Sequence, residues 1–184
     1  VFNTSLTGYM EVLTDPSYRG QIVTMTCPHI GNVGITYEDL EAEQPHVAGF
    51  VVREVSEITS NWRSEISLQE YLKLNAIIGI TDIDTRALTR HIRTAGAMRA
   101  VLSTEIFNEE KLVEMAKNAP SISDIDLVNQ VTCDEIHAWD DPIDRRWHIN
   151  RSHLNGTLKH LHVVAYDFGI KNNILRSLRD RVGR

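Results

Sequence analysis

The sequence predicts an α/β fold, and three observations support this class. Short runs rich in β-branched residues, which are typical of strands, occupy residues 21–27 and 47–55. Segments with apolar residues at helical spacing alternate with them, most clearly at residues 84–93 and 108–117. Near the end of the chain, an apolar run at residues 162–167 is followed by a glycine turn and a helical segment. That order of strand, turn and helix is the first half of a βαβ unit.

Composition indicates an ordinary globular protein that can bury a core. Hydrophobic residues make up 42% of the 184 residues and charged residues 24%. The formal net charge of −6 is spread along the sequence. This charge disfavours a nucleic-acid partner, which would require a basic stripe. No run reaches transmembrane length, so no membrane partner is expected.

The opening residues hold the densest group of turns, hydroxyl groups and glycines in the chain. Residues 1–2 are predicted to end a strand, and residues 9–13 to form one or two helical turns. Asp15 precedes Pro16, which restricts the residue ahead of it to an extended or turn conformation. Ser17 is therefore predicted to lie in a turn, with its hydroxyl oriented by a fixed backbone. Two interpretations of this segment are possible: it binds a ligand, or its polar residues only cap helices and form turns. The pattern alone favours the second.

The next part of the chain is predicted to alternate strands and loops. Residues 21–27 form a strand that ends at Pro28, because proline cannot donate a ladder hydrogen bond. Residues 29–34 contain two glycines and are interpreted as a loop. A short acidic helix is expected at residues 37–43, and one strong strand at residues 47–55.

Capping signals define the helices in the middle of the chain. Ser67 is followed three residues later by Glu70, the pattern of a capping box at a helix start. An apolar run at residues 76–80 is predicted to be a buried strand. The helix after it, at residues 84–93, is expected to end at Gly96 in the manner of a C′ glycine.

Four further elements are predicted before the end of the chain. Residues 98–103 are expected to form a strand, and residues 108–117 a helix with an apolar inner face. Residues 121–129 suggest a short helical connection. Residues 131–147, with two tryptophans among charged residues, are expected to form a strand pair or a loop near a domain edge.

The cysteines and histidines were the other candidates for chemistry. Cys27 and Cys133 form no CxxC pattern, which favours a reducing, cytoplasmic compartment. Neither lies on a sharp strand-to-helix turn with activating neighbours, so each is interpreted as a buried small hydrophobic residue rather than a nucleophile. Metal ligation is a second alternative, because four histidines gather within residues 148–162. They are His148, His153, His160 and His162. Their spacing matches no zinc pattern, so we expect solvated histidines and no metal.

Four segments carry a resemblance to a known family. They are FNTSLTGYMEVLTDPSY (2–18), QIVTMTCPHIGNVG (21–34), ITDIDTRALTRHIR (80–93) and HVVAYDFGIKNNILR (162–176). In this order they resemble the small, glutamine-hydrolysing chain of carbamoyl-phosphate synthase. Residues 108–157 carry little of the resemblance.

The resemblance implies two domains. Residues 1–150 are expected to form the amino-terminal domain of the small chain, a β/β/α arrangement whose opening strands are missing. Residues 151–160 are expected to be a linker. Residues 161–184 would be the first strand and helix of a class I glutamine amidotransferase domain, which is incomplete here. The start at Val1 instead of Met, within an apolar run, agrees with a piece of a longer chain.

The resemblance also implies a reaction. In the family, a Cys-His-Glu triad hydrolyses glutamine through a thioester, and two backbone amides stabilise the oxyanion. The ammonia passes to the large subunit, which makes carbamoyl phosphate from bicarbonate and ATP for pyrimidine and arginine biosynthesis. The triad is implied to lie downstream, so we expect no catalytic residue and no activity in the 184 residues alone. No cofactor is expected in this chain, since ATP and Mg would bind the large subunit.

One site residue can be carried over from the family. The serine of the Asp-Pro-Ser-Tyr turn, Ser17, is implied to contact the substrate L-glutamine where the two domains meet. The implied partners are L-glutamine and the large subunit of carbamoyl-phosphate synthase. An alternative of another class is a non-catalytic interaction module that docks a large partner chain.

Overall fold

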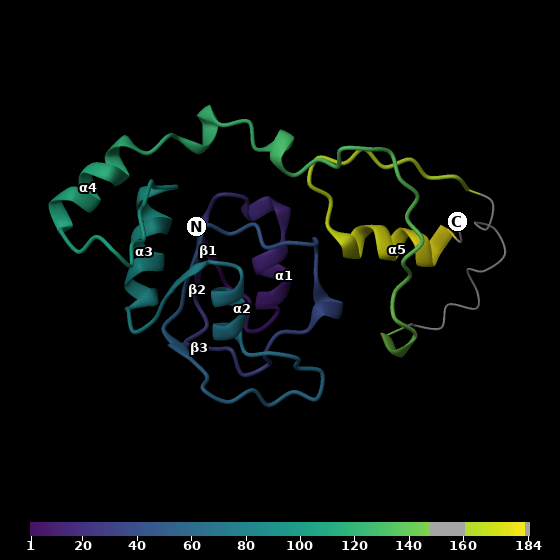
Figure 1. Cartoon of the computed structure of the whole chain (residues 1–184), viewed down its shortest axis with the longest axis horizontal. Coiled ribbons are helices and arrows are strands. Elements are labelled where there is room, and N and C mark those ends of the chain that lie inside the picture. Colours follow the sequence, from purple (N-terminus) through teal and green to yellow (C-terminus); the bar gives the residue numbers. More distant parts are fainter. Residues whose placement is uncertain (148–160, 183–184) are drawn as a thin grey trace. The chain divides into compact units, whose positions relative to one another are not determined.

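A computed structural model describes residues 1–147 and 161–182 of the chain (Figure 1). The chain divides into two compact units, Val1–Asp126 and Leu127–Arg184. Within the described ranges, no helix is both long enough and apolar enough to cross a membrane. The expected linker at residues 151–160 lies outside the described residues, and the predicted domain limits stay a prediction.

The first unit is built on a four-stranded parallel sheet, which confirms the predicted α/β class. In spatial order its strands are β1 (Phe2–Asn3), β2 (Ile22–Met25), β4 (Gly49–Val51) and β6 (Ile78–Ile80). Every neighbouring pair is parallel, with Val23 of β2 opposite Phe50 of β4. Parallel neighbours need a crossover connection between them, and α-helices supply two of these crossovers.

Helix α1 (Tyr9–Thr14) connects β1 to β2 and confirms the predicted helical turns. Gly8 precedes it with φ 77°, a left-handed conformation that glycine adopts without strain. The buried Thr14 hydroxyl donates to the carbonyl of Met10 at 2.9 Å and accepts from the backbone N–H of Glu41 at 2.9 Å. The end of α1 is thereby tied to the loop before β4.

The strand predicted at residues 47–55 divides into two strands that belong to different sheets. The chain bends at Arg53, and β5 (Glu54–Val55) follows the bend. Beyond the bend, the backbone N–H of Ser56 donates to the carbonyl of Ile30 at 2.7 Å. The single-strand prediction was wrong because an apolar run shows where strands are favoured and not where the chain changes its pairing partner.

A second, two-stranded parallel sheet results from this change of partner. Strand β3 (His29–Ile30) pairs with β5, with Ile30 opposite Val55. Residues 29–34 were predicted to be a loop, and their first two residues are therefore a strand instead. Ile30 is fully buried, which explains why the chain is extended there.

Helix α2 (Leu68–Leu74) begins with the predicted capping box. The Ser67 hydroxyl accepts from the backbone N–H of Glu70 at 3.2 Å, and the Glu70 carboxylate accepts from the backbone N–H of Ser67 at 2.9 Å. The helix leads to β6, where a buried strand was predicted. The strand is therefore confirmed. Its predicted burial is not, because β6 lies at the edge of the sheet and Ile80 is 38% exposed.

Helix α3 (Thr85–Ala95) confirms the helix predicted from residue 84. The Asp84 carboxylate accepts from the backbone N–H of Ala87 at 2.9 Å, which satisfies one of the free donors at the helix start. The helix ends at Gly96, which has φ 85°. Thr85 is the buried residue of α3, so the helix is anchored at its amino-terminal end.

Helix α4 (Glu109–Asn118) is also confirmed, with Asn108 as its N-cap. The Asn108 side chain accepts from the backbone N–H of Lys111 at 2.8 Å. No residue of α4 is buried, and Val113 is 51% exposed. Of the expected apolar inner face, Leu112 and Ala116 are half-buried, whereas Val113 and Met115 are exposed, so this face is covered only in part.

Residues 98–103 do not form the predicted strand. The segment packs through a side chain instead of joining the sheet by hydrogen bonds. A Cβ placed on Gly49 would lie 2.6 Å from Cδ1 of Leu102, so Leu102 rests on β4 where a side chain is lacking. Arg99 donates to the carbonyl of Ala119 at 2.9 Å and ties the segment to the end of α4.

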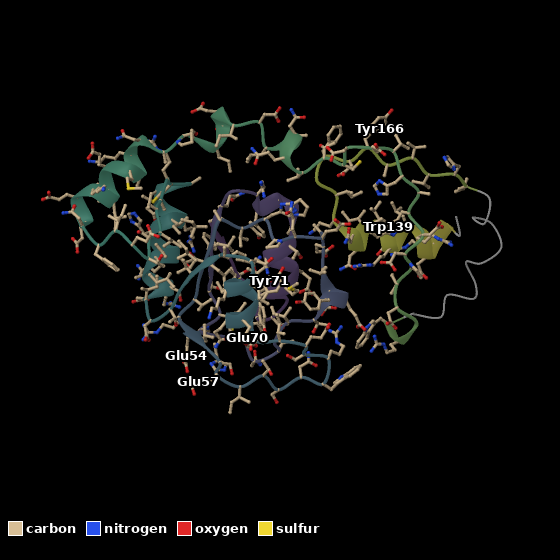
Figure 2. The ribbon with its side chains drawn as sticks, viewed as in Figure 1. Glu54, Glu57, Glu70, Tyr71, Trp139 and Tyr166 are labelled. Carbon is tan, nitrogen blue, oxygen red and sulfur yellow. The ribbon has the colours of Figure 1, made fainter. Side chains whose placement is uncertain are left out.

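The core of the first unit combines α1, β2, β4 and α2 (Figure 2). Tyr71 of α2 belongs to this core and is 4% exposed. The apolar side chains that are completely or almost completely withdrawn from solvent include Tyr9, Leu13, Val23, Met25, Ile30, Ile35, Phe50 and Leu68.

The second unit contains α5 (Asn172–Val182) and two single helical turns, Val128–Gln130 and Arg145–Trp147. The helix predicted after the glycine turn is confirmed by α5. The buried strand predicted at residues 162–167 is wrong, since the segment pairs with no strand in the described chain and residues 162–166 are exposed. Tyr166, for example, is 82% exposed and points outward (Figure 2). Of the two possibilities for residues 131–147, the loop is the one observed.

Candidate functional site

The Ser17 turn is held rigidly by its own backbone. Pro16–Tyr18 form one turn of 3-10 helix with Pro16 at its start. The Asp15 carboxylate accepts from the backbone N–H of Ser17 at 2.9 Å, and the backbone N–H of Tyr18 donates to the Asp15 carbonyl at 3.0 Å. Proline fixes one dihedral angle and the aspartate closes the turn from the side, as the Asp-Pro pattern predicted.

A second set of hydrogen bonds attaches this turn to the polar residues that precede α1. The Asn3 side-chain amide donates to the Tyr18 hydroxyl at 3.0 Å and its oxygen accepts from the backbone N–H of Ser5 at 2.8 Å. The Gln21 side chain donates to the carbonyl of Ser17 at 2.8 Å. The polar residues of the opening segment therefore form one connected surface around Ser17.

Ser17 itself is exposed, and its hydroxyl has no hydrogen-bond partner among the residues that the structure describes. Its backbone N–H and carbonyl are both used by the turn. The side chain is thus the free group on a fixed backbone, which suits it to donate to or accept from a polar ligand. The ligand-contact interpretation of Ser17 stays a prediction, with which this geometry is compatible.

His46 lies next to the turn, and no local pattern in the sequence points to it. Its backbone N–H donates to the carbonyl of Leu13 at 2.9 Å, and its carbonyl accepts from the backbone N–H of Gly20 at 3.1 Å. The side chain is 6% exposed and its Nδ1 atom is buried without a hydrogen-bond partner. Burial, with a smaller contribution from Arg19, lowers the pKa of His46. A neutral imidazole therefore supports the turn from inside at neutral pH.

The turn can bind a ligand, but it lacks the neighbouring base that covalent catalysis by Ser17 would need. A serine nucleophile requires a base within hydrogen-bonding distance of its hydroxyl. No such bond joins Ser17 to any described residue. The chemistry that this arrangement supports is hydrogen bonding to a polar ligand.

The cysteines lie in different surroundings. Cys27 is half-buried against the core, and its thiol lies 3.5 Å from the carbonyl oxygen of His29. Cys133 is exposed, so its predicted burial was wrong. Desolvation of the thiol and its hydrogen bond to the Asp167 carboxylate raise the pKa of Cys133. A raised pKa disfavours the thiolate, which is the nucleophilic form.

Three residue types of a nucleophilic triad meet near Cys27, without the geometry of one. His29 Nδ1 lies 3.7 Å from the Glu54 carboxylate, across the pair of strands β3 and β5. The thiol of Cys27, however, faces the backbone carbonyl of His29. Both side chains of the His29–Glu54 pair are well exposed, as expected of a surface ion pair.

The charged side chains around Arg63 form hydrogen bonds and ion pairs with one another. The guanidinium of Arg63 donates to the two Asp39 carboxylate oxygens at 2.9 and 2.8 Å and to Glu38 at 3.3 Å. Burial, together with the neighbouring carboxylates of Asp39 and Glu41, raises the pKa of Glu11. In residues 1–147 and 161–182, no group of three or more His, Cys, Asp or Glu is placed to hold a metal ion. His148, His153 and His160 lie outside those ranges, and His162 is exposed. That these histidines are solvated and bind no metal stays a prediction.

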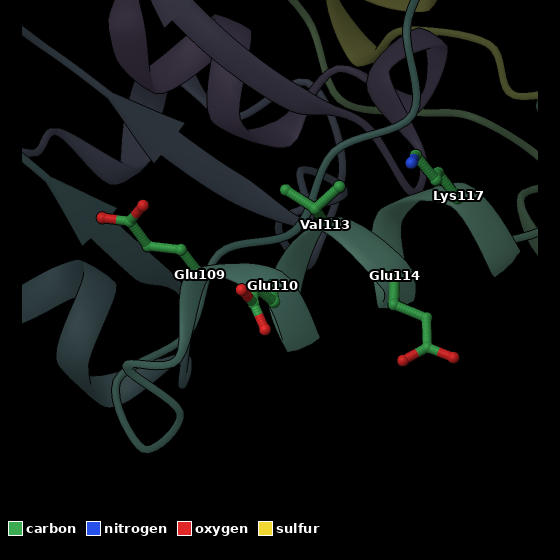
Figure 3. Close-up of a pocket in the computed structure, with 5 residues that line it drawn as sticks. All are labelled: Glu109, Glu110, Val113, Glu114 and Lys117. Carbon is green, nitrogen blue, oxygen red and sulfur yellow. The ribbon is translucent and has the colours of Figure 1, made fainter.

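Ser17 lines neither of two hollows on the described surface. The first, of about 450 Å³, is an open groove on α4 lined by Val113, Lys117 and three glutamates (Figure 3). The second, of about 400 Å³, is mostly apolar and lies between α2 and the ends of β4 and β6. Its lining includes Phe50, Leu68 and Leu72, which also belong to the core. The groove on α4 has charged groups but no convergent set of donors and acceptors, and the second hollow has few polar groups.

Comparison with known proteins gives a consistent result. Residues 1–102 match the family model described as carbamoyl-phosphate synthase small chain, CPSase domain. The chain is 53% identical over 179 residues to the carbamoyl phosphate synthase small chain of Syntrophotalea carbinolica, covering 97% of this chain and 47% of the relative. It is 51% identical over 181 residues to the small chain of a Nostoc species, covering 97% and 46%.

A plant relative matches over the same extent. The chain is 50% identical over 179 residues to the chloroplastic carbamoyl phosphate synthase small chain of Oryza sativa, covering 97% of this chain and 39% of the relative. The chain therefore spans about half the length or less of these curated relatives.

Proposed function

The chain belongs to the family of carbamoyl-phosphate synthase small chains, and we propose that it forms the amino-terminal part of a subunit that hydrolyses glutamine. The observation that carries the proposal is the match of residues 1–102 to the family model, extended by about 50% identity along 97% of the chain. The ammonia would pass to a large subunit that makes carbamoyl phosphate from bicarbonate and ATP, for pyrimidine and arginine biosynthesis. The family names of the relatives support this assignment.

In this proposal Ser17 contacts the side chain or main chain of L-glutamine. Its support is the fixed backbone of the turn and a hydroxyl that no described residue uses. ATP and Mg would bind the large subunit, so this chain would hold no cofactor. A cytoplasmic location is part of this proposal, although the name of the rice relative is chloroplastic.

We assign residues 161–184 to the start of an amidotransferase domain, and residues 1–150 to the β/β/α amino-terminal domain. The exposed apolar side chains between residues 161 and 168 support the first assignment, because a strand with partners on both sides would bury them. They are Leu161, Val163, Val164, Tyr166 and Phe168.

The 184 residues by themselves should not hydrolyse glutamine. Cys27 faces a carbonyl and Cys133 has a raised pKa, so neither is activated as a nucleophile. An ammonia-release assay on the 184-residue chain, with and without alkylation of both thiols, tests this. Ammonia production that persists after alkylation would contradict the assignment of the triad to another part of the subunit.

The role of Ser17 is tested by Ser17→Ala in the complete small subunit, paired with its large subunit. We expect glutamine binding to weaken by about 0.5–1.5 kcal/mol, the value of one hydrogen bond, seen as a higher KM for glutamine. Activity with added ammonia should not change, because ammonia bypasses the glutamine site.

Ser123→Ala is the matched control. Ser123 lies in a similar 3-10 turn, where the Ser121 hydroxyl accepts its backbone N–H at 3.3 Å. It should leave the KM for glutamine unaltered. An unchanged KM in Ser17→Ala would remove Ser17 from the site. Co-purification with the large subunit without any effect on glutamine use would favour the non-catalytic interaction module.

A further inference from the structure

The main chain of His46 is attached to both ends of the segment that contains Ser17. Its backbone N–H donates to the carbonyl of Leu13, before the turn, at 2.9 Å. Its carbonyl accepts from the backbone N–H of Gly20, after the turn, at 3.1 Å. Because Leu13 and Gly20 enclose residues 14–19, the place of His46 in the fold also fixes the place of the turn.

The imidazole ring of His46 is buried and has an unpaired polar atom. The residue is 6% exposed, and Nδ1 has no hydrogen-bond partner among the described residues. A buried polar atom without a partner lowers stability, so it calls for a role that compensates the cost.

The Asp15 carboxylate is shared between the Ser17 backbone and the electrostatic environment of His46. It accepts from the backbone N–H of Ser17 at 2.9 Å, which closes the turn. It is also the acidic group that favours a proton on His46, against burial and the positive charge of Arg19. A change in the charge of the ring therefore acts on the group that holds Ser17 in place.

The charges that act on the ring come from the turn itself. Burial is the largest cause of the lowered pKa of His46, and the two charged groups that modify it are Arg19 and Asp15. Two other carboxylates belong to the adjoining segments, Glu11 on α1 and Glu41 in the loop before β4. These two interact with each other, since Glu41 raises the pKa of Glu11.

We propose that His46 is a positioning residue for the glutamine site, whose neutral ring leaves the Asp15 carboxylate hydrogen-bonded to Ser17 and whose protonation draws that carboxylate away. An imidazolium is a donor at both ring nitrogens, so a protonated His46 requires an acceptor for Nδ1. Asp15 supplies it at the expense of the turn, and the Ser17 hydroxyl loses its fixed position. The inference rests on the proposed contact between Ser17 and L-glutamine.

The first test is the KM for glutamine of the complete small subunit, paired with its large subunit, at pH 7.5 and 5.0. In the unaltered protein KM should rise at the lower pH by roughly two- to tenfold, the value of one hydrogen bond. In His46→Gln, which has no proton to gain, the rise should be smaller. Catalytic groups elsewhere in the subunit titrate in both proteins alike and cancel in this comparison.

Two controls separate positioning from a general effect of pH. His91→Gln removes an exposed histidine of α3 and should keep the pH dependence of the unaltered protein. Ser17→Ala removes the contact through which His46 acts, so its KM should be raised already at pH 7.5 and should no longer respond to His46→Gln. A purely structural role of His46 would instead change KM in the Ser17→Ala background as well.

The second test needs no glutamine and uses nuclear magnetic resonance on the 184-residue chain. The backbone amide signals of Ser17 and Gly20 should shift with the same midpoint as the ring protons of His46, below the ordinary histidine value of about 6.5. These shifts should be absent in His46→Gln. Asp15 titrates in a lower range, near the ordinary aspartate value of about 3.9, so the two events are distinguishable.

Two results would overturn the inference. One is the same dependence of KM on pH in the unaltered protein and in His46→Gln. The other is amide signals of Ser17 and Gly20 that do not follow the ring of His46 in the unaltered chain, a measurement that decides the matter even if His46→Gln does not fold. A complete unaltered subunit that hydrolyses no glutamine would reject the proposed function instead, and the amide titration would still decide whether His46 controls the turn.

Discussion

In the first unit Leu13, Val23 and Phe50 are withdrawn from solvent, whereas in the second unit none of the described residues is buried. The second unit is held by polar contacts instead. The Asp167 carboxylate accepts from the backbone N–H groups of Gly169, Ile170 and Cys133, each at 2.8 Å. A helix and a capped turn form in both units, but among the described residues only the first unit has a sheet against which they can be buried.

The difference shows what a core contributes. Burial of apolar side chains stabilises a fold by about 1.5–3 kcal/mol for each large residue, whereas exposed ion pairs contribute about 0–1 kcal/mol. The second unit relies on pairs such as Arg176 with Asp141, at 2.9 Å. We therefore expect most of the stability of the chain to reside in the first unit.

The largest difference in the free energy of unfolding is expected when one aromatic ring is removed from the first unit and, for comparison, one from the second. Phe50 is 1% exposed and Phe168 is 69% exposed. Phe50→Ala should lower the free energy of unfolding by about 3–5 kcal/mol, because it leaves a cavity between β4 and the helices. Phe168→Ala should change it by about 0.5 kcal/mol or less. Urea denaturation measures both, and similar losses in the two variants would contradict the comparison.

A smaller and more local effect is expected at Asp167. Asp167→Ala removes the acceptor of three backbone N–H groups, at a cost of about 0.5–2 kcal/mol, as for the loss of a helix cap. Amide hydrogen exchange should become faster at Cys133, Gly169 and Ile170. The exposed Asp134 offers a control, Asp134→Ala, in which these amides should exchange as before.

The contribution of the Asp167 carboxylate to the stability of the second unit should depend on pH. Burial of Asp167 opposes ionisation, but the backbone donors of Ile170, Cys133 and Gly169 outweigh it and lower its pKa. Its contribution is therefore present above the ordinary aspartate pKa of about 3.9 and is lost as the pH falls through the lowered value. The protection factor of the Gly169 amide, which is corrected for the intrinsic pH dependence of exchange, should fall in this range; a constant protection factor would remove Asp167 as the anchor.

The smallest change in stability is expected from the titration of His46. This residue tests the comparison of the two units from the other side, because it is a polar group buried in the unit with the apolar core. Its pKa is lowered by burial, so the unfolded chain binds a proton at a higher pH than the folded chain. Stability should therefore fall as the pH drops below about 6.5, by at most about 1.4 kcal/mol for each pH unit. The midpoint of urea denaturation at several pH values measures this.

The control for the pH effect is His46→Gln, which removes the titrating group. Its denaturation midpoint should depend less on pH between 7.5 and 5.5 than that of the unaltered chain. The same pH dependence in both proteins would show that other histidines cause it.

Local signals in the sequence predicted the helices and their caps well. Ser67 accepts the backbone N–H of Glu70, as the predicted capping box requires. Asp84 and Asn108, which were predicted to be the first residues of their helices, are the N-caps in the structure. The turn at Ser17 was predicted for the same reason, since Asp-Pro restricts the backbone wherever it occurs. His46 was missed because its burial and its contacts with Leu13 and Gly20 come from residues distant in the sequence.

Strands were predicted less well because a strand exists only with a partner. The apolar runs at residues 98–103 and 162–167 satisfy the pattern of a strand but have no neighbour to pair with in the described chain. The run at residues 47–55 has two different partners and so divides at Arg53. A pattern of apolar residues indicates burial, but the hydrogen-bonded neighbour decides whether a strand forms.

The sequence by itself determined the α/β class, the helix starts, the fixed turn at Ser17 and the family, because these depend on neighbouring residues or on direct similarity. Only the tertiary structure decided the order of the strands, the burial of His46 and the exposure of Cys133. These properties depend on which distant segments come together. Propensity and spacing within one segment do not contain that information.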